Sequence, residues 1–308
     1  GIWRIDTARG PVCAKRALAK LRVAADWRAP IERNQYEARW MAVAQQAAPG
    51  SAPQLLGQHP ALGVLVMQWL APADHTLWKQ QLREGHAELA TAQAVGRRLA
   101  RIHAFAAARP ELAAQFDTDR IFYDIRLEPY LVATAVQHPD LAPQLHALVA
   151  QTQAHAVALV HGDVSPKNIL VGPQGPVLLD AECAWWGDPA FDLAFCLNHL
   201  LLKCLWAPAA RGAFLACFDA LAATYLAGVD WEPREAVEQR AAHLLPGLLL
   251  ARVDGKSPAE YITTDVQREP VRSCARLLIQ RPVSRLADVG AAWRREIERG
   301  RRTASAPC

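Results

Sequence analysis

The chain lacks the features that mark metal–thiolate domains, disulfide frameworks and nucleic-acid binders. Its seven cysteines are odd in number and include no C-x-x-C pair, which disfavours both a disulfide framework and a zinc site. Lys and Arg total 34 against 30 Asp and Glu, so the formal charge of +4 is small for 308 residues. We therefore expect free, mostly buried thiols in a reducing cytoplasm and no nucleic-acid partner.

The sequence also lacks a long uninterrupted apolar run. Its most apolar stretch, LAFCLNHLLLKCLWAPAA, contains Asn198, His199 and Lys203, so it is too interrupted to span a bilayer, and we expect no membrane partner. The basic cluster WRREIERGRRTASAP favours a solvated helix running into a frayed tail, with nucleic-acid contact as the alternative. We expect no signal peptide ahead of the apolar stretch, and we expect the natural protein to begin upstream of Gly1.

The first 70 residues have the character of a small β-rich lobe. Strand-like runs occupy 2–7, 11–18 and 61–70, and the turn-forming segments ARGP and QHPALG punctuate them. One helical stretch at 31–47 places Tyr36, Trp40, Val43 and Ala47 on a single stripe, with Pro30 suited to its first turn. We expect this helix to pack on the strands.

The chain after residue 70 is mostly Ala- and Leu-rich helix, with periodic stretches at 91–107 and 141–157. A β hairpin of ALVHGDVSPKNILV and GPVLLDAEC interrupts it. With 52% apolar residues the chain can bury a large core. The prediction is an α+β protein of two lobes in one unit, an N-terminal lobe at 1–70 and a helical lobe at 71–308.

The loop of this hairpin carries residues suited to phosphoryl transfer. Asp163 and Asn168 are five apart, and Asp180 ends the run PVLLD, so a hairpin brings the three together. Asn168 and Asp180 suit Mg²⁺, which prefers oxygen ligands. Asp163 is then left to orient a hydroxyl and accept its proton, and Lys167 adds a donor toward the γ-phosphate. A tight turn is the alternative, but the full pattern H-G-D-x4-N-I-L-V followed by L-L-D favours the chemistry.

HGDVSPKNIL with LLDAE resembles the aminoglycoside phosphotransferase and choline kinase superfamily, small-molecule kinases that share the protein-kinase fold. The resemblance implies a bilobal protein-kinase-like fold that binds ATP and Mg²⁺. It implies a lysine on the third strand, matched by Lys15 in VCAK, and a glutamate on the next helix, matched by Glu37. The hinge that would contact adenine through its backbone falls at Gln68, Trp69 and Leu70. The family's glycine-rich loop would lie before IWRIDT, where only Gly1 remains.

Four further residues take expected roles from the same resemblance. Asp192 in GDPAFDLAF braces the catalytic loop from the next helix, while Asp188 is a helix-cap candidate. His161 packs structurally and is not the base. Glu182 reaches a second magnesium, with a surface glutamate at a strand end as the alternative.

The acceptor cleft should lie in the helical lobe beside Asp163. Arg252 would favour a carboxylate or phosphate on the acceptor, as would Lys256, although RVDGKSP also reads as an ordinary helix end. The helical half has no acidic run that would suit a polycationic aminoglycoside. Trp185 and Trp186 would suit a quaternary ammonium group, but packing is favoured. The candidate acceptor residues are Tyr123, Asp124, Arg126, His199, Lys203, Arg252, Asp254 and Lys256.

These observations predict an ATP-dependent phosphotransferase acting on a hydroxyl of a small metabolite or an aminoglycoside-like molecule. The alternative is a non-catalytic, nucleotide-binding pseudokinase or scaffold. Such proteins commonly lose the strand lysine, the catalytic Asp or the metal-binding Asp, whereas Lys15, Asp163 and Asp180 are all present here. A protein kinase is disfavoured because GDPAFDLAF follows Asp180 too closely to leave room for a peptide platform.

Overall fold

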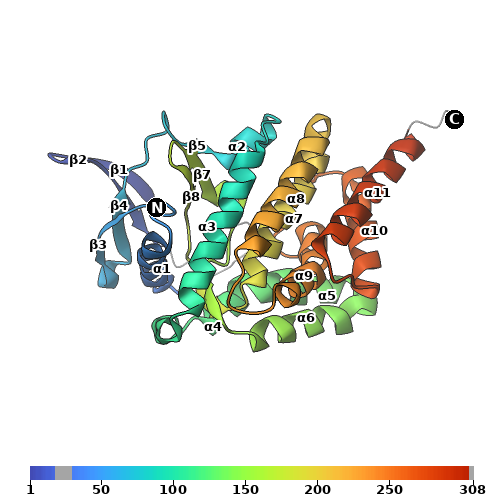
Figure 1. Cartoon of the computed structure of the whole chain (residues 1–308), viewed down its shortest axis with the longest axis horizontal. Coiled ribbons are helices and arrows are strands. Elements are labelled where there is room, and N and C mark those ends of the chain that lie inside the picture. Colours follow the sequence, from blue (N-terminus) through green and yellow to red (C-terminus); the bar gives the residue numbers. More distant parts are fainter. Residues whose placement is uncertain (18–29, 305–308) are drawn as a thin grey trace.

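The computed structural model describes residues 1–17 and 30–304. Four strands form an antiparallel sheet in the order β1-β2-β4-β3. A single helix, α1, packs against β3 and β4, and Figure 1 shows this part on the side of the molecule away from the C-terminal helices. The bounds are β1 (Ile2–Thr7), β2 (Gly10–Arg16), α1 (Arg33–Ala47), β3 (Leu55–His59) and β4 (Val64–Gln68).

The sheet confirms three predicted strands, in part, and adds one that was missed. The run at 11–18 ends as a strand at Arg16, and Leu18 lies outside the described residues. The segment QHPALG is not a simple turn, because its first two residues belong to β3 and the chain reverses in a short 3₁₀ helix, η1 (Pro60–Leu62). β3 contains Gly57 and a register shift beside it. Such a strand has little propensity of its own, so its pairing with β4 defines it.

Helix α1 confirms the expected inward stripe. Trp40 is 1% exposed, Val43 is buried, and Tyr36 packs at the edge of the core. Glu37 lies on the same buried side. A buried carboxylate requires a partner, so the helix presents both an apolar face and one charge toward the rest of the molecule.

Helices make up most of the remaining chain, and those predicted at 91–107 and 141–157 are confirmed as α3 and α6. Between them lies η3 (Tyr123–Val132), a π-helical segment. The bounds are α2 (Trp78–Arg83), α3 (Leu89–Ala107), η2 (Pro110–Gln115), α4 (Asp119–Phe122), α5 (Ala133–Gln137), η4 (Pro139–Leu141), α6 (Ala142–Ala154), α7 (Ala190–Trp206), η6 (Pro208–Ala210), α8 (Arg211–Ala227), α9 (Arg234–Asp254), α10 (Asp265–Gln280) and α11 (Leu286–Ala304).

The predicted hairpin at 158–183 is confirmed only at its centre. β7 (Ile169–Gly172) and β8 (Gly175–Leu178) pair as a hairpin, and β5 (Thr76–Leu77) adds a third strand. The flanking segments belong to a second ladder, in which β6 (Ala158–Val160) pairs with β9 (Trp185–Gly187). The chain between β6 and β7 contains a short 3₁₀ turn, η5 (Pro166–Asn168), and it is therefore a loop between two small sheets.

Helix α7 forms the centre of the core. Every residue from Ala190 to Cys204 is buried, as expected of a helix that neighbours surround on all sides. It packs against α8 and α9, while α8 also packs against α3, and Figure 1 shows these helices side by side. The six cysteines of the described chain are free and buried, which confirms the prediction for those thiols.

Two further segments bear on the exclusions made from the sequence. Pro208–Ala227 is long and apolar enough to cross a membrane by length and composition alone, with a mean hydropathy of 1.2, and 44% of its apolar window is buried in the fold. Helix α11 continues through the basic cluster near the C-terminus as far as Ala304. The expected frayed tail lies outside the described residues.

The crossing of α3 and α8 depends on a glycine. A Cβ on Gly96 would lie 2.7 Å from the backbone oxygen of Leu221. Gly96→Ala should therefore lower the free energy of unfolding by about 1–3 kcal/mol through overpacking, measured by urea denaturation. Gly212→Ala is the matched control, because a Cβ there meets nothing within 4 Å, and we expect unchanged or slightly increased stability. Equal effects of the two substitutions would contradict this account of the crossing.

Candidate active site

The site is built on the loop between β6 and β7, and its shape depends on Gly162. That residue has φ of 78°, in the left-handed region that glycine adopts without strain. A Cβ there would lie 2.5 Å from the backbone oxygen of Cys183. The loop thus approaches the segment after β8 so closely that only glycine fits.

Helix α7 fixes this loop through Asp192. Its carboxylate accepts the backbone N–H groups of His161 (2.7 Å) and Gly162 (2.8 Å). His103 on α3 lies 3.2 Å from the same carboxylate through Nε2. One buried charge therefore orders two consecutive peptide groups immediately before Asp163, the brace expected of Asp192.

His161 is placed for packing. It is fully buried, and its ring stands edge-on to Trp40 with centroids 4.6 Å apart. Nδ1 accepts the backbone N–H of Asp163 (3.1 Å), and Nε2 lies 3.1 Å from the carbonyl of Leu179, which only a protonated Nε2 can satisfy. Burial lowers the pKa of His161, so the neutral ring holds the loop and has no nitrogen left to accept a substrate proton.

Asp163 is a buried carboxylate held between two cations. Arg126 Nη2 lies 2.8 Å from Oδ2, and Lys167 Nζ lies 3.2 Å from the same oxygen. Burial alone would raise the pKa of Asp163, but Arg126 and Lys167 outweigh it and lower that pKa below its ordinary value. The carboxylate is therefore ionised at neutral pH, as a proton acceptor must be.

Lys15 lies in a cluster of carboxylates. It bonds both oxygens of Glu37 (2.9 and 2.8 Å), contacts Glu182 at 2.9 Å, and forms an ion pair with Asp180. Burial would lower the pKa of Lys15, but these three acids raise it well above its ordinary value. The expected pairing of Lys15 with Glu37 is present. Lys15 lies on β2, the second strand of the described sheet, which pairs with β1 and β4.

Asp180 and Asn168 offer oxygens on neighbouring elements. Asp180 has φ of 66°, the one described non-glycine residue with positive φ, and such a conformation costs free energy that the surroundings must offset. Burial would raise the pKa of Asp180, but Lys15 lowers it to about 2. Asn168 donates Nδ2 to the carbonyl of Asp163 (3.1 Å), a bond that orients its amide. Carboxylate and amide oxygens suit a hard divalent cation.

Glu182 is less suited to a metal than the sequence suggested. Its carboxylate lies close to those of Glu37 and Asp180, yet it also bonds Arg33 (2.6 Å) and Lys15 (2.9 Å). A cation at the centre of these acids would take the position that the Lys15 ammonium already occupies. Glu182 therefore stabilises the two basic side chains.

A cavity of about 290 Å³ lies between the sheet and this loop. It is lined on one side by the predicted hinge residues Gln68, Trp69 and Leu70, and on the other by Asn168 and Asp180. Lys15 and Glu37 also line it. All residues predicted to bind nucleotide thus face one cavity, whose apolar walls suit a flat ring.

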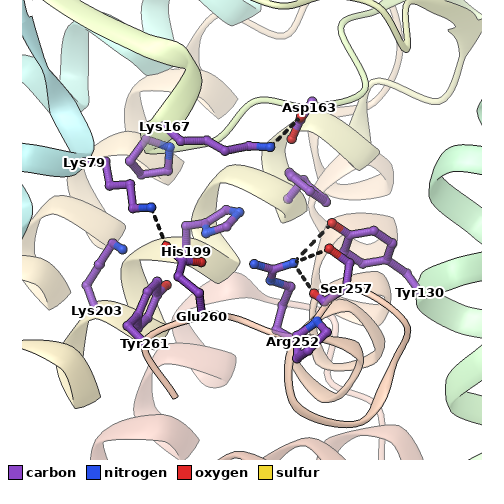
Figure 2. Close-up of a pocket in the computed structure, with 13 residues that line it drawn as sticks. Lys79, Tyr130, Asp163, Lys167, His199, Lys203, Arg252, Ser257, Glu260 and Tyr261 are labelled. Carbon is purple, nitrogen blue, oxygen red and sulfur yellow. Dashed lines mark hydrogen bonds and ion pairs between the residues drawn. The ribbon is translucent and has the colours of Figure 1, made fainter. Parts of the chain in front are cut away.

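A second cavity of about 160 Å³ lies on the far side of the loop, and Figure 2 shows its lining. Asp163 and Lys167 lie at one end, while Lys203 and Tyr261 lie at the other. Lys167 also lines the first cavity, so the two adjoin at this side chain. Of the predicted acceptor residues, three line the second cavity: His199, Lys203 and Arg252.

The other five predicted acceptor residues do not line it, because other partners hold them. Arg126 bonds Asp163 and the carbonyl of Gly162 and is 7% exposed. Asp124 pairs with Arg120, Asp254 with His138 and Arg272, and Lys256 with Glu128, while Tyr123 packs against the apolar core. These five predicted residues therefore lie outside the lining of the second cavity, and sequence periodicity does not reveal such partners.

Sequence reasoning missed several lining residues: Lys79, Tyr130, Ser257, Glu260 and Tyr261. Ser257 falls inside RVDGKSP, a stretch that the sequence did mark, and Glu260 and Tyr261 follow it within three residues. Lys79 on α2 had no motif around it. Trp185 packs on Phe122 with ring centroids 4.2 Å apart and donates to Asp119 (2.6 Å), as the packing interpretation expected. Asp188 accepts the N–H of Ala190 (2.9 Å) at the start of α7.

The profile of the phosphotransferase enzyme family, APH, matches residues 3–232. The methylthioribose kinase of Cronobacter sakazakii is 26% identical over 231 residues, 65% of this chain and 56% of that protein. The same enzyme of Yersinia pseudotuberculosis is 27% identical over 228 residues, 65% of this chain and 55% of that protein. The chain spans about half the length of these curated relatives.

Solved structures share the fold. An amicoumacin kinase in complex with AMP-PNP, Ca²⁺ and Ami has a TM-score of 0.52 at 14% identity, covering 92% of this chain and 86% of that one. A choline/ethanolamine kinase family protein from Mesorhizobium loti has a TM-score of 0.50 at 18% identity, with the same coverage of both chains. The protein-kinase-like fold expected from the resemblance is confirmed.

The surroundings of Lys203 predict a pH dependence of stability. Burial and the nearby Lys79 lower the pKa of Lys203 from 10.5 to about 6. Between these values the unfolded chain binds a proton that the folded chain does not, so this group makes stability rise with pH. Lys203→Met should raise the thermal midpoint at about pH 7 and flatten that rise, measured by calorimetry across the window.

Lys256→Met is the matched control, because Lys256 is an exposed lysine paired with Glu128. It should leave the slope between pH 6 and 10.5 as in the unmodified protein. An unchanged slope in Lys203→Met would show that Lys203 keeps its proton on folding.

Proposed function

Because the chain belongs to the phosphotransferase enzyme family, we propose that it transfers the γ-phosphoryl group of ATP to a hydroxyl of a small molecule. One observation carries the proposal. The ionised Asp163 lines the second cavity, Asn168 and Asp180 line the first, and Lys167 lines both. A nucleotide in the first cavity and a hydroxyl in the second would meet at this loop, which is the arrangement that in-line transfer needs.

The first cavity is the proposed nucleotide site. Gln68, Trp69 and Leu70 would contact adenine, and Lys15 would bind the phosphates while Glu37 keeps its ammonium in place. Phosphate oxygens, like carboxylates, form strong charge-assisted hydrogen bonds with an ammonium group, so a bound nucleotide would compete with Asp180 for Lys15. Asp180 would then be released toward the metal.

Mg²⁺ is the proposed metal, held by Asn168 and Asp180. These two residues suit Mg²⁺ because they offer one amide oxygen and one carboxylate beside the proposed phosphate site. Phosphate oxygens and water would complete the coordination of the ion. When bound, the ion neutralises phosphate charge and orients the γ-phosphoryl group. We do not assign Glu182 to it, because Lys15 and Arg33 already bond that carboxylate.

Asp163 is the proposed proton acceptor and aligns the acceptor hydroxyl. Arg126 keeps it ionised and, through the carbonyl of Gly162, fixes its loop. Asp192 and His161 hold the backbone on either side of Gly162. Lys167 would stay in contact with the phosphoryl group during its transfer, since this side chain lines both cavities. Catalysis would come mainly from positioning and neutralisation of charge.

The remaining features of the proposal concern the whole protein. We propose a lobe boundary near residue 70, a cytoplasmic location where thiols stay reduced and ATP is present, and a small acceptor with neither nucleic acid nor membrane as partner. The relatives give no support for the non-catalytic alternative, and Lys15, Asp163 and Asp180 would all be available for the reaction.

Asp163→Asn and Asp180→Ala separate binding from chemistry. Asp163→Asn should bind Mg·AMP-PNP as the unmodified protein does while ADP formation in a metabolite extract falls roughly 10²–10⁴-fold, because the amide accepts no proton. Asp180→Ala should weaken Mg·AMP-PNP binding as well as turnover, because a metal ligand is lost. Calorimetry measures the binding and a coupled ADP assay measures the turnover.

Asp219→Asn is the matched control, because Asp219 is a half-exposed carboxylate paired with Arg294 on the surface. It should change neither binding nor turnover. Full turnover in Asp163→Asn would remove Asp163 from the reaction, and unchanged metal-dependent binding in Asp180→Ala would remove Asp180 from the metal.

A further inference from the structure

The second cavity contains more positive than negative side chains. Lys79, Lys167, Lys203 and Arg252 line it, against two carboxylates, Asp163 and Glu260. Lys167 pairs with Asp163, and Lys79 pairs with Glu260. Among the described residues, neither Lys203 nor Arg252 has a carboxylate within ion-pair distance. Two buried basic groups therefore face the cavity without a counter-ion.

Burial penalises the charge of Lys203, although two aromatic faces favour it. It is 1% exposed, and its ammonium lies 3.9 Å from the ring centroid of Trp206 and 3.7 Å from that of Tyr261. These rings stack on each other with centroids 4.5 Å apart. Lys79 and Arg252 oppose its protonation, while Glu260 favours it at longer range. An anion entering the cavity would supply the partner that the fold does not.

Arg252 and His199 add donors to the same space. Arg252 is 7% exposed and uses Nη1 for Tyr130 (3.3 Å) and Ser257, but its Nε has no hydrogen-bond partner among the described residues. His199 is 7% exposed, and its Nε2 also has none. Buried polar atoms are normally hydrogen-bonded, and Figure 2 shows His199 between Lys203 and Asp163, with Arg252 beside Ser257 and Tyr130.

The same residues argue against a cationic acceptor. A quaternary ammonium group is recognised by open aromatic faces, whereas the protein's own Lys203 occupies those of Trp206 and Tyr261. Tyr130 lies beneath Arg252, with the guanidinium 5.8 Å from its ring centroid. A polycationic ligand would meet four basic side chains and would find both carboxylates already paired.

We propose that the acceptor is a small hydroxylated anion, whose carboxylate or phosphate binds Lys203 and Arg252 while its hydroxyl meets Asp163. The proposal rests on the kinase function proposed above and names its substrate class. A cavity of about 160 Å³ limits the acceptor to a small molecule. Arg252 gives bidentate geometry to either oxyanion, so the two chemistries share one site.

A matched series of three-carbon probes tests the charge preference. Glycerate and glycerol phosphate carry the two candidate anions, glycerol is neutral, and aminopropanediol is cationic, while all retain hydroxyl groups. Binding is measured by ligand-observed NMR on the full chain without nucleotide, so the result does not depend on turnover. We expect an anionic probe to bind at least about tenfold more tightly than glycerol, and aminopropanediol to bind no better than glycerol.

Variants locate the site. Lys203→Met should reduce binding of the anionic probes to the level of glycerol, whereas Lys256→Met removes an exposed lysine outside the cavity and should leave their affinity unchanged. Binding should also take up protons in weakly buffered solution at about pH 8, because the anion returns the charge to Lys203. Other titratable side chains face the same space: His199, Lys79, Arg252 and Glu260. Loss of the proton uptake in Lys203→Met would therefore assign that uptake to Lys203.

The outcomes distinguish this inference from the function on which it rests. Equal binding of charged and neutral probes, or anion binding that Lys203→Met leaves intact, would overturn the anionic acceptor. ADP formation with glycerol or aminopropanediol but with neither anion would do the same while leaving the kinase function standing. Anion binding that depends on Lys203, without ADP formation with any of the four probes or in a metabolite extract, would support the anion site and contradict the kinase.

Discussion

The buried ion cluster around Lys15 is the interaction on which the rest of the site depends. It joins β2 to α1 through Glu37 and to the segment after β8 through Asp180 and Glu182, so one ammonium ties the small sheet to the catalytic hairpin. A buried cation of this kind is strongly destabilising once its partners are removed. Burial raises the pKa of Glu37 to about 7, which Lys15 opposes. The cluster packs three carboxylates closely around one ammonium group. A bound phosphate and a divalent cation would rearrange these ion pairs together.

The catalytic loop separates two cavities of different chemistry. In the first cavity, apolar walls meet oxygens suited to a metal, and in the second cavity basic groups outnumber the two carboxylates, Asp163 and Glu260. Asp192 fixes the loop from below by accepting two backbone N–H groups, while Gly162 lets the chain pass close to Cys183. Under the proposed function, a rigid loop would let Asp163 and Lys167 align the two ligands. The basic end of the second cavity would orient the acceptor away from the reacting phosphate.

Much of this site was predictable because its chemistry is concentrated in short segments. The loop and the end of β8 carry Asp163, Asn168 and Asp180 within eighteen residues, and the family resemblance singled out Lys15 and Glu37. β3 was missed because Gly57 weakens its pattern and its partner strand defines it. Arg126 was assigned to substrate because sequence cannot show that the π-helical turn directs it to Asp163. The lining of the second cavity was predicted only in part, through the stretch RVDGKSP. The partner of each charged side chain on α9 depends on tertiary contacts, which the sequence does not show.

Phosphoryl transfer to a small hydroxylated anion is the central claim. The most direct measurement is mass spectrometry of a metabolite extract after incubation of the protein with Mg·ATP labelled in the γ-phosphoryl oxygens. The account predicts a labelled product that equals one acidic metabolite plus one phosphoryl group and that disappears when Asp163 is replaced by asparagine. Label found only in inorganic phosphate, or only on neutral or cationic metabolites, would contradict it.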